Sequence, residues 1–361
     1  DDSAPHRRAT YPTAFVGTHR KDYDLLEVES SNIFAALEAA YTRAHHAELT
    51  RAAVAFAPFL LARGLYATAE THLQQAYDAA IAAQDHHGLA GTLLYLGEMT
   101  WKRGEYAQAG QYLQTGLGYA RKIDDHERIC ALLANLGSIS WKRGEYKLAE
   151  TYLQEGLALA HELGNLERTC ELLQVLGSVE RMRGNYRQAD AYLQEGLKLT
   201  RQIEERELMC PILLNLGVIA GEQGDYVRSE AYFQEGLLLA RQLQHSEWIS
   251  GFLNSLGDIA SEQDHYARAM RYFQEGLELA RQLEHREWIS LLLLNLGITA
   301  RKQKSYVLSE RYSQESLVLA RQIGIPQITC YILNEYGNLH LEQHLPERAA
   351  KDFQEMFTIA P

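Results

Sequence analysis

Apolar residues recur with a helical period along most of the chain, and residues 127–163 show the pattern clearly. Leu133, Leu136 and Ser140 follow the i, i+3, i+7 spacing that places side chains on one side of a helix. A second stripe is formed by Tyr146, Ala149, Leu153, Leu157 and Ala160. Between the stripes lies Gly144, a residue suited to the left-handed conformation that ends a helix. The pattern predicts helices over 127–142 and 146–163, joined by a short turn.

This two-helix pattern recurs every 40 residues. Glycine marks each first helix at Gly97, Gly137, Gly177, Gly217, Gly257, Gly297 and Gly337, and tyrosine opens the second helices at Tyr66, Tyr106, Tyr146, Tyr186, Tyr226, Tyr266 and Tyr306. A fixed period of this length indicates a solenoid in which each unit buries its apolar face against its neighbours. We therefore predict an all-α fold, a right-handed superhelical solenoid of antiparallel helix pairs, with the first helix of each pair on the concave side.

The pattern also divides the chain. Residues 1–24 carry no sustained period and are expected to form an extended arm, and residues 25–49 are expected to form a capping helix. Residues 50–361 are expected to form an array of eight units, the last of them shortened. In this last unit Pro346 replaces the tyrosine and Met356 replaces a glycine of the second helix. Because a terminal unit has no following neighbour, the helix near 347–359 should be the least protected part of the array.

A further glycine recurs inside the second helices, at Gly116, Gly156, Gly196, Gly236 and Gly276. Glycine in the middle of a helix costs about 1 kcal/mol relative to alanine. Its recurrence therefore predicts a close approach between helices that a methyl group would obstruct.

The charge of the chain restricts its partners. The formal net charge is −12, whereas nucleic-acid binding calls for a basic stripe. The sequence has no apolar run of the roughly 18 residues that a membrane helix needs. We expect no nucleic acid and no membrane as partners, and a cytoplasmic location. The chain begins Asp1-Asp2-Ser3, and we interpret it as a fragment of a longer protein, with a processed N-terminus as the alternative.

The four cysteines sample one position of the repeat. They are Cys130, Cys170, Cys210 and Cys330, and Ser250 and Ser290 fill the same position in other repeats. Equivalent positions in neighbouring helices lie about 8–10 Å apart or further, whereas a disulfide needs Cα atoms within about 7 Å. The position is therefore interpreted as a packing slot for a small side chain.

The landmark residues together resemble the tetratricopeptide repeat family. Leu136, Gly137, Gly144, Tyr146, Ala149 and Leu157 match the family pattern in order and spacing, and the match recurs over about residues 50–345. Gly156 stands where the family usually has Ala, and each unit is about six residues longer than the usual 34. The extra length resembles the long repeats of kinesin light chains and bacterial regulators. The resemblance implies a protein-binding array.

A second resemblance lies at residues 27–38, where the sequence Glu-Val-Glu-Ser-Ser-Asn-Ile-Phe-Ala-Ala-Leu-Glu is similar to the junction that precedes the repeats in bacterial NB-ARC (STAND-class) signalling ATPases. In that class the repeats form the sensor arm behind a nucleotide-binding switch. No GxxxxGK[ST] loop occurs in this chain. Any nucleotide-binding domain would therefore lie upstream of it.

Asparagines on the face opposite the leucine core are the first candidate binding residues. Asn135, Asn215 and Asn295 lie two residues before the landmark glycine, and Asn254 and Asn334 lie one residue earlier in their units. In peptide-binding members of the family such an Asn holds the ligand backbone with its paired donor and acceptor. The alternative is an Asn that hydrogen bonds within its own array.

Aromatic and cationic residues form the second candidate group. Trp101 and Trp141 occupy equivalent positions, and the associated cations are Lys102, Lys142, Arg181, Arg301 and Lys302. Such a combination suits an acidic or aromatic peptide; the alternative is packing of the tryptophans between adjacent first helices. Trp248 and Trp288, at helix entries, are assigned to packing.

No set of residues suggests catalysis, a cofactor or a metal site. The 14 histidines include no HExxH motif, and adjacent pairs such as His86-His87 do not share a helix face. The recurring Glu155, Glu195, Glu235, Glu275 and Glu315 are interpreted as a solvated outer face. The leading hypothesis is a non-catalytic module that binds a protein or peptide on its concave face, as the sensor or scaffold arm of a signalling ATPase. The alternative is a small-molecule-binding regulatory domain of a transcription activator, of the kind that controls the maltose regulon.

Overall fold

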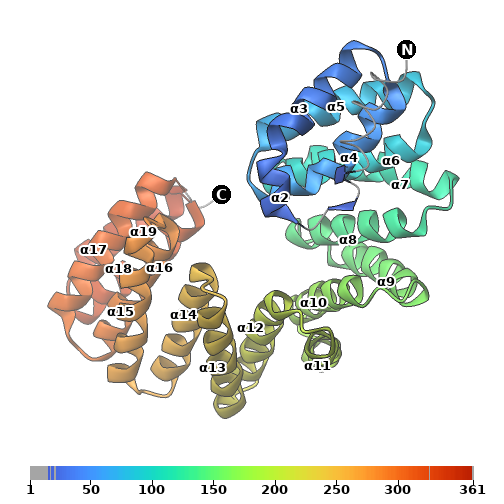
Figure 1. Cartoon of the computed structure of the whole chain (residues 1–361). Helices are drawn as coiled ribbons and strands as arrows, with labels where there is room; N and C mark the ends of the chain where they lie inside the picture. Colours follow the sequence, from blue (N-terminus) through green and yellow to red (C-terminus); the bar gives the residue numbers. More distant parts are fainter. Residues whose placement is uncertain (1–14, 17, 20–21, 325, 360–361) are drawn as a thin grey trace, which may run out of the picture. The chain divides into compact units, whose positions relative to one another are not determined.

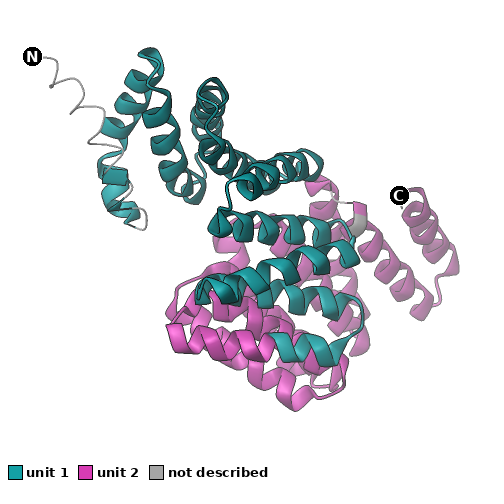
Figure 2. Ribbon diagram, turned by 90° about the vertical axis from the view of Figure 1, so that its right-hand side faces the viewer, with its two compact units in different colours: residues 1–192 teal, residues 193–361 magenta. Residues whose placement is uncertain are grey.

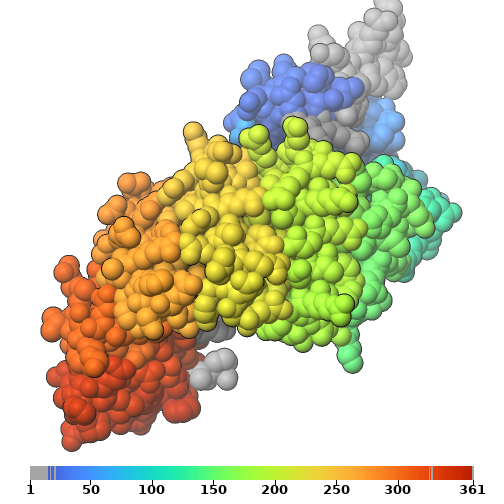
Figure 3. All heavy atoms as spheres, turned by 90° about the horizontal axis from the view of Figure 1, so that it is seen from below, coloured from blue at the N-terminus to red at the C-terminus, as the bar shows by residue number. Residues whose placement is uncertain are grey.

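The described part of the chain is entirely helical in the computed structural model (Figure 1), which describes residues 15–16, 18–19, 22–324 and 326–359. The chain divides into two compact units, residues 1–192 and 193–361, and the division falls within helix α11 (Figure 2). The all-α class predicted from the sequence is confirmed. Within unit 2 the repeats follow one another in sequence order in the space-filling view (Figure 3).

Helices α4 to α18 have 17 or 18 residues each, and α2, α3 and α19 are shorter. Those that begin in unit 1 are α2 (Tyr23–Val28), α3 (Ser30–Thr42), α4 (His46–Ala62), α5 (Tyr66–Ala82), α6 (His86–Lys102), α7 (Tyr106–Lys122), α8 (His126–Lys142), α9 (Tyr146–Glu162), α10 (Leu166–Met182) and α11 (Tyr186–Ile203). Those of unit 2 are α12 (Arg206–Glu222), α13 (Tyr226–Gln242), α14 (Ser246–Glu262), α15 (Tyr266–Gln282), α16 (Arg286–Lys302), α17 (Tyr306–Ile323), α18 (Pro326–Glu342) and α19 (Pro346–Ile359). In the described residues α4 to α19 form eight helix pairs.

The start of the chain is more compact than an extended arm in the parts that the structure describes. Residues 1–14, 17, 20 and 21 of the expected arm lie outside the described residues. Val16 is fully buried in the N-terminal apolar core, and α2 already begins at Tyr23. The segment 25–49 contains the end of α2, all of α3 and the start of α4, which pairs with α5.

From α3 onward, turns of two or three residues separate successive helices, and each contains a residue with positive φ. Gly144 has φ 76°, which confirms its predicted helix-ending role. Asp264 and Lys304, at the same position in later repeats, adopt φ 60° without the freedom of glycine. Several helix starts are fixed by side-chain caps, as when Asp125 accepts a hydrogen bond from the Arg128 backbone N–H. Such caps satisfy N–H groups that have no partner within the helix.

The landmark glycine makes room for a large side chain from the second helix of its own pair. A Cβ atom on Gly217 would lie 2.3 Å from the nearest atom of the Phe233 ring, and one on Gly137 would lie 2.5 Å from Leu153. Phe233 and Leu153 are both buried. The two helices of a pair can therefore interlock only where the first helix has no side chain.

The second recurring glycine faces the next repeat. A Cβ on Gly236 would lie 2.2 Å from the Phe252 ring of α14, and one on Gly156 would lie 3.3 Å from Leu172 of α10. The predicted close approach is confirmed, and its partner is a side chain of the following first helix. The last pair has Met356 at this position, and its side chain packs against a core cluster that includes Leu317 and Leu333.

The cysteine position lies at the interface between the two helices of one pair. Cys130, Cys170 and Cys210 are buried free thiols, and Cys330, in the last pair, is half-buried. The Cys130 thiol contacts the Gly156 carbonyl oxygen at 3.3 Å, and the Ser290 hydroxyl donates to the Ser316 carbonyl oxygen at 3.2 Å. The predicted packing slot is confirmed, with a small polar side chain that reaches the backbone of its partner helix.

Candidate functional site

The even-numbered helices from α4 onward form the inner face of each unit. In unit 1 they are α4, α6, α8 and α10, and in unit 2 they are α12, α14, α16 and α18. Successive members contact one another within each unit, and the odd-numbered helices lie behind them. Helices on the inner side of a curved stack approach more closely than those on the outer side. Side chains on these helices that point away from the leucine core therefore line the inner face.

Three side chains of unit 2 form a hydrogen-bonded group on this face, which we call the amide–carboxylate cluster: Asn254 and Asp258 of α14, and Asn295 of α16. The Asn254 amide donates to Asp258 Oδ2 at 3.0 Å. The Asn295 amide donates to Asn254 Oδ1 at 2.9 Å and to Asp258 Oδ1 at 3.2 Å. Two of the predicted asparagines thus come together across neighbouring repeats and hold one carboxylate between them.

Asp258 is the most perturbed group of the inner face. Asp258 is exposed to solvent, although protein atoms surround its carboxylate closely enough to reduce its hydration. This desolvation, followed by repulsion from Glu262, raises the pKa of Asp258 to about 7; Lys302 and the hydrogen bond from Asn254 act in the opposite direction. Asp258 can therefore change its charge near neutral pH.

The cations predicted in unit 2 are engaged by carboxylates of neighbouring repeats. Arg301 pairs with Glu335 at 2.9 Å and also with Glu342, both on α18. Lys302 pairs with Glu262 of α14 at 3.1 Å. An acidic ligand would therefore have to compete with these carboxylates for Arg301 and Lys302. With these carboxylates and Asp258 included, acidic groups outnumber basic ones around the cluster.

The predicted residues Trp101, Trp141, Lys102 and Lys142 lie in unit 1. Trp101 and Trp141 are half-buried and pack against core clusters that each extend from their own repeat into the next. The Lys142 ammonium lies 4.4 Å from the centre of the Trp141 ring, a cation–π contact. Lys102 lies 3.9 Å from the Glu98 carboxylate. The two lysines are therefore already engaged by neighbouring side chains, Lys142 by Trp141 and Lys102 by Glu98.

Two further carboxyl groups belong to the inner face of unit 1. Desolvation raises the pKa of Glu98 on α6 and of Glu171 on α10, and Arg168 opposes both shifts. Arg168 donates to Glu171 at 2.5 Å. A cation between two desolvated carboxyl groups holds this part of the face close to neutrality.

The other predicted residues remain separate. The Asn215 amide donates to the Pro211 carbonyl oxygen of its own helix at 2.9 Å. Asn135 and Asn334 are half-buried on α8 and α18, and Arg181 is half-buried on α10. Trp288 lies over Gly251 and packs against the core of unit 2, which confirms its assignment to packing.

Sequence reasoning missed Asp258 and its carboxylate neighbours. The available signal was the spacing of Asn254, Asp258 and Glu262, since residues four apart share a helix face. This spacing alone could not single out Asp258 among the charged residues. What distinguishes Asp258 is the hydrogen bond from Asn295, which joins residues 37 positions apart and cannot be predicted from local spacing.

The glutamates of the second helices have partners that the sequence analysis did not assign. Glu155 accepts from Arg121 at 2.5 Å, Glu235 from Arg201 at 2.5 Å and Glu315 from Arg281 at 2.6 Å; Glu275 pairs with Arg241. In each pair the arginine precedes the glutamate by 34 residues. These groups are exposed, as expected, but they join one second helix to the next. Single exposed pairs of this kind contribute about 0–1 kcal/mol.

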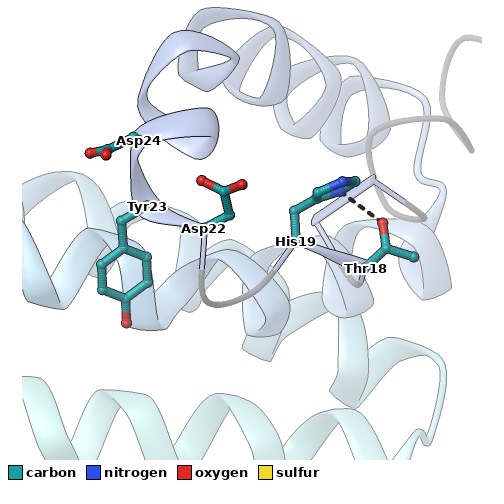
Figure 4. A pocket seen from close by; sticks show the side chains of 5 residues that line it. All are labelled: Thr18, His19, Asp22, Tyr23 and Asp24. Carbon is teal, nitrogen blue, oxygen red and sulfur yellow. Dashed lines mark hydrogen bonds between the residues drawn. The ribbon is translucent and has the colours of Figure 1, made fainter.

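Surface hollows occur away from the inner-face clusters. One, of about 610 Å³, is lined by Thr18, His19, Asp22, Tyr23 and Asp24 (Figure 4). Asp22 caps α2 through the Leu25 N–H, and the His19 ring contacts the Thr18 hydroxyl at 2.9 Å. Another, of about 900 Å³, lies beside Arg183, whose guanidinium pairs with Glu150 and Glu180, both at 2.7 Å. The polar groups in these hollows thus already stabilise local structure.

Two searches of the described residues bear on other classes of function. None of their helices is long and apolar enough to cross a membrane. Among the same residues, no three His, Cys, Asp or Glu side chains are arranged to hold a metal ion.

Comparisons with known proteins agree with this architecture. The tetratricopeptide repeat family matches the chain over residues 127–202 and 208–282. No curated protein matches the sequence.

Similar solved structures include the apo form of the quorum sensor NprR from B. thuringiensis, with TM-score 0.72, 14% identity and coverage of 98% of each chain. A Rap protein in complex with competence and sporulation factor has TM-score 0.66 and 14% identity, with 96% of this chain and 98% of that chain covered. A STAND protein with a tetratricopeptide repeat sensor from Pyrococcus horikoshii has TM-score 0.64 and 14% identity, with 91% of this chain and 53% of that chain covered. These likenesses concern the fold. Together with the helix pairs, they show a helical-repeat array, of which residues 127–202 and 208–282 match the tetratricopeptide repeat family.

Proposed function

We propose that this chain is a non-catalytic module that binds a peptide, or an extended segment of a protein, on its inner face. The observation that carries the proposal is the amide–carboxylate cluster, in which Asn254 and Asn295 come from successive first helices and meet on one accessible face. Side-chain amides carry a donor and an acceptor, so they can match the N–H and C=O groups of an extended backbone.

The similar structures support a peptide as ligand. The Rap protein mentioned above was solved with competence and sporulation factor, and a Rap conjugation gene regulator of plasmid pLS20, with TM-score 0.59 and 12% identity, was solved with the Phr* peptide. NprR is a quorum sensor. Helical repeats of this architecture can therefore present a peptide-binding surface, and this chain has suitable side chains on the corresponding helices.

We further propose that the module is the sensor arm of a signal-transduction ATPase. The chain aligns with about half of the STAND protein from Pyrococcus horikoshii, which carries a tetratricopeptide repeat sensor. The similarity of residues 27–38 to the junction before such repeats supports the same assignment. In this arrangement the nucleotide-binding domain precedes the chain.

The test is a binding screen of the whole chain against an array of random seven-residue peptides. The variant Asn135→Ala/Asn215→Ala/Asn295→Ala removes three amides spaced at intervals of 80 residues. Each lost hydrogen bond should weaken binding by about 0.5–1.5 kcal/mol, so the triple variant should bind at least about tenfold more weakly.

The fold should survive, because the same repeat position holds Tyr95, Val175 and Ser255 in other repeats. A folded triple variant that binds the selected peptides with unchanged affinity would refute the role of the amides. The small-molecule alternative would be favoured by two results together. The wild-type chain would retain no peptide, and it would bind a small molecule whose binding is abolished by substitutions in a single repeat.

A further inference from the structure

We propose that the amide–carboxylate cluster binds a cationic nitrogen of the peptide ligand, an ammonium or a guanidinium group, through the carboxylate of Asp258. The inference rests on the proposed function and deepens it by naming the ligand group that unit 2 recognises. Three features of the structure lead to it: a carboxylate without a cationic partner, its fixed orientation, and an aromatic neighbour.

The first feature is the uncompensated charge of Asp258. Among the described residues, no Lys, Arg or His side chain forms an ion pair with it. The nearby cations are taken, because Lys302 pairs with Glu262 and Arg301 pairs with two carboxylates of α18. A desolvated carboxylate without a counter-charge is costly, so a cation supplied by a ligand gains more here than at an ordinary surface carboxylate.

The second feature is orientation. Each carboxylate oxygen of Asp258 accepts one amide N–H, Oδ2 from Asn254 and Oδ1 from Asn295. A carboxylate has about four acceptor positions, so two remain for donors of a ligand. Because amides on two different helices hold the carboxylate, little side-chain freedom remains to be lost on binding. A group with two or more N–H donors, such as an ammonium or guanidinium, fits this arrangement.

The third feature is Tyr331 of α18, whose side chain is about half exposed at 52%. Helix α18 contacts α16, which carries Asn295. Desolvation is the main cause of the raised pKa of Tyr331, followed by the charges of Glu335 and Asp258. The face of a tyrosine ring attracts cations, so this side chain favours the same class of ligand group.

The inference couples binding to the protonation of Asp258. Three charged or titratable groups interact with it electrostatically: Glu262 on α14, Lys302 on α16 and Tyr331 on α18. Only the ionised carboxylate pairs with a cation. Since the pKa of Asp258 in the free protein is raised to about 7, affinity for a cationic peptide should increase about tenfold from pH 6 to pH 8.

The test uses the whole chain and the array of random seven-residue peptides, synthesised with and without Lys and Arg and with free or acetylated N-termini. The wild-type chain should retain peptides that carry a cationic group at least about tenfold more strongly than their neutral counterparts. Asp258→Asn should abolish this preference while it keeps weaker binding of neutral peptides. Asn338 occupies the same repeat position, so an Asn at this position is already accommodated by the fold.

Glu275→Gln is the matched control, because it removes one negative charge from the outer face of the same unit, where Glu275 pairs with Arg241. This variant should keep the preference and its pH dependence. Wild-type binding without a preference for cationic peptides would overturn the inference and leave the proposed function intact. An equal loss in both variants would overturn it too, since general electrostatic attraction would then explain the preference. No retained peptide at all would overturn both proposals.

Discussion

The glycines of the second helices allow a prediction in which one substitution, made in two repeats, has opposite effects. Gly156 and Gly236 occupy the same repeat position, but their neighbours differ. A Cβ on Gly156 would lie 3.3 Å from a terminal methyl of Leu172, whereas one on Gly236 would lie 2.2 Å from the ring of Phe252. Phe252 is fully buried, so its ring has little space into which to move.

The magnitudes follow from two opposing contributions. Alanine gains about 1 kcal/mol over glycine inside a helix, and an additional methyl group in a tightly packed core costs about 1–3 kcal/mol. For Gly156→Ala the overlap is slight, so the unfolding free energy should stay unchanged or increase by up to about 1 kcal/mol. For Gly236→Ala the overlap dominates, and the unfolding free energy should fall by up to about 2 kcal/mol.

The assay is urea unfolding followed by circular dichroism, together with hydrogen exchange of α13 and α14 to localise the effect, because a repeat array need not unfold in one step. Phe252→Leu provides the control, since it recreates the Gly156–Leu172 contact. In that background Gly236→Ala should lose its cost, with a coupling of more than about 1 kcal/mol. If Gly236→Ala is as stable as Gly156→Ala, the packing argument is wrong.

Three further predictions follow from the structure. Gly144→Ala should destabilise the chain by about 1–2 kcal/mol, because residue 144 has φ 76°. Gly110→Ala should stabilise it by up to about 1 kcal/mol, because a methyl group on this residue of α7 would meet no other atom. Equal shifts of the two variants in thermal unfolding would contradict this. The pKa of Asp258 is raised in the folded state to about 7, so the folded chain should lose stability as pH rises from about 4 to about 7. Asp258→Asn should therefore raise the midpoint of urea unfolding at pH 8 and not at pH 4. Equal effects at both pH values would count against the raised pKa of Asp258. Helix α19 should exchange its amide hydrogens fastest among the repeat helices, because Ala349 is its one buried residue among those described; exchange as slow as that of α12 and α13 would show that reasoning to be incorrect.

The sequence predicted the parts of the fold that depend on local periodicity. The helix pair around Gly137 begins and ends within one residue of the predicted bounds. The turn at Gly144 and the packing position of Cys130 follow from single residues whose chemistry permits few alternatives. These features repeat, so one correctly interpreted unit describes the others.

The inner-face chemistry was less accessible, because it depends on the register between helices. Arg301 and Lys302 could be assigned to the correct face, but their carboxylate partners lie 34 to 41 residues away and are visible only once the helices are placed side by side. Asn254 and Asn295 were predicted separately, and their contact joins two repeats. Asp258 was overlooked because its raised pKa arises mainly from desolvation by the surrounding protein, which no local sequence motif indicates.

The buried thiols make the array a reporter of its own local opening. Burial raises the pKa of Cys130, and it raises the pKa of Cys210 to about 11, and a thiol reagent attacks the thiolate. Labelling of these positions therefore requires the surrounding repeat to open first. Since Cys130, Cys170 and Cys210 are buried in three different repeats, the order in which a mass spectrometer detects their modification would reveal the order in which these repeats open. A bound ligand should slow labelling in the repeats that it spans, so the same three positions could map its footprint without any engineered label.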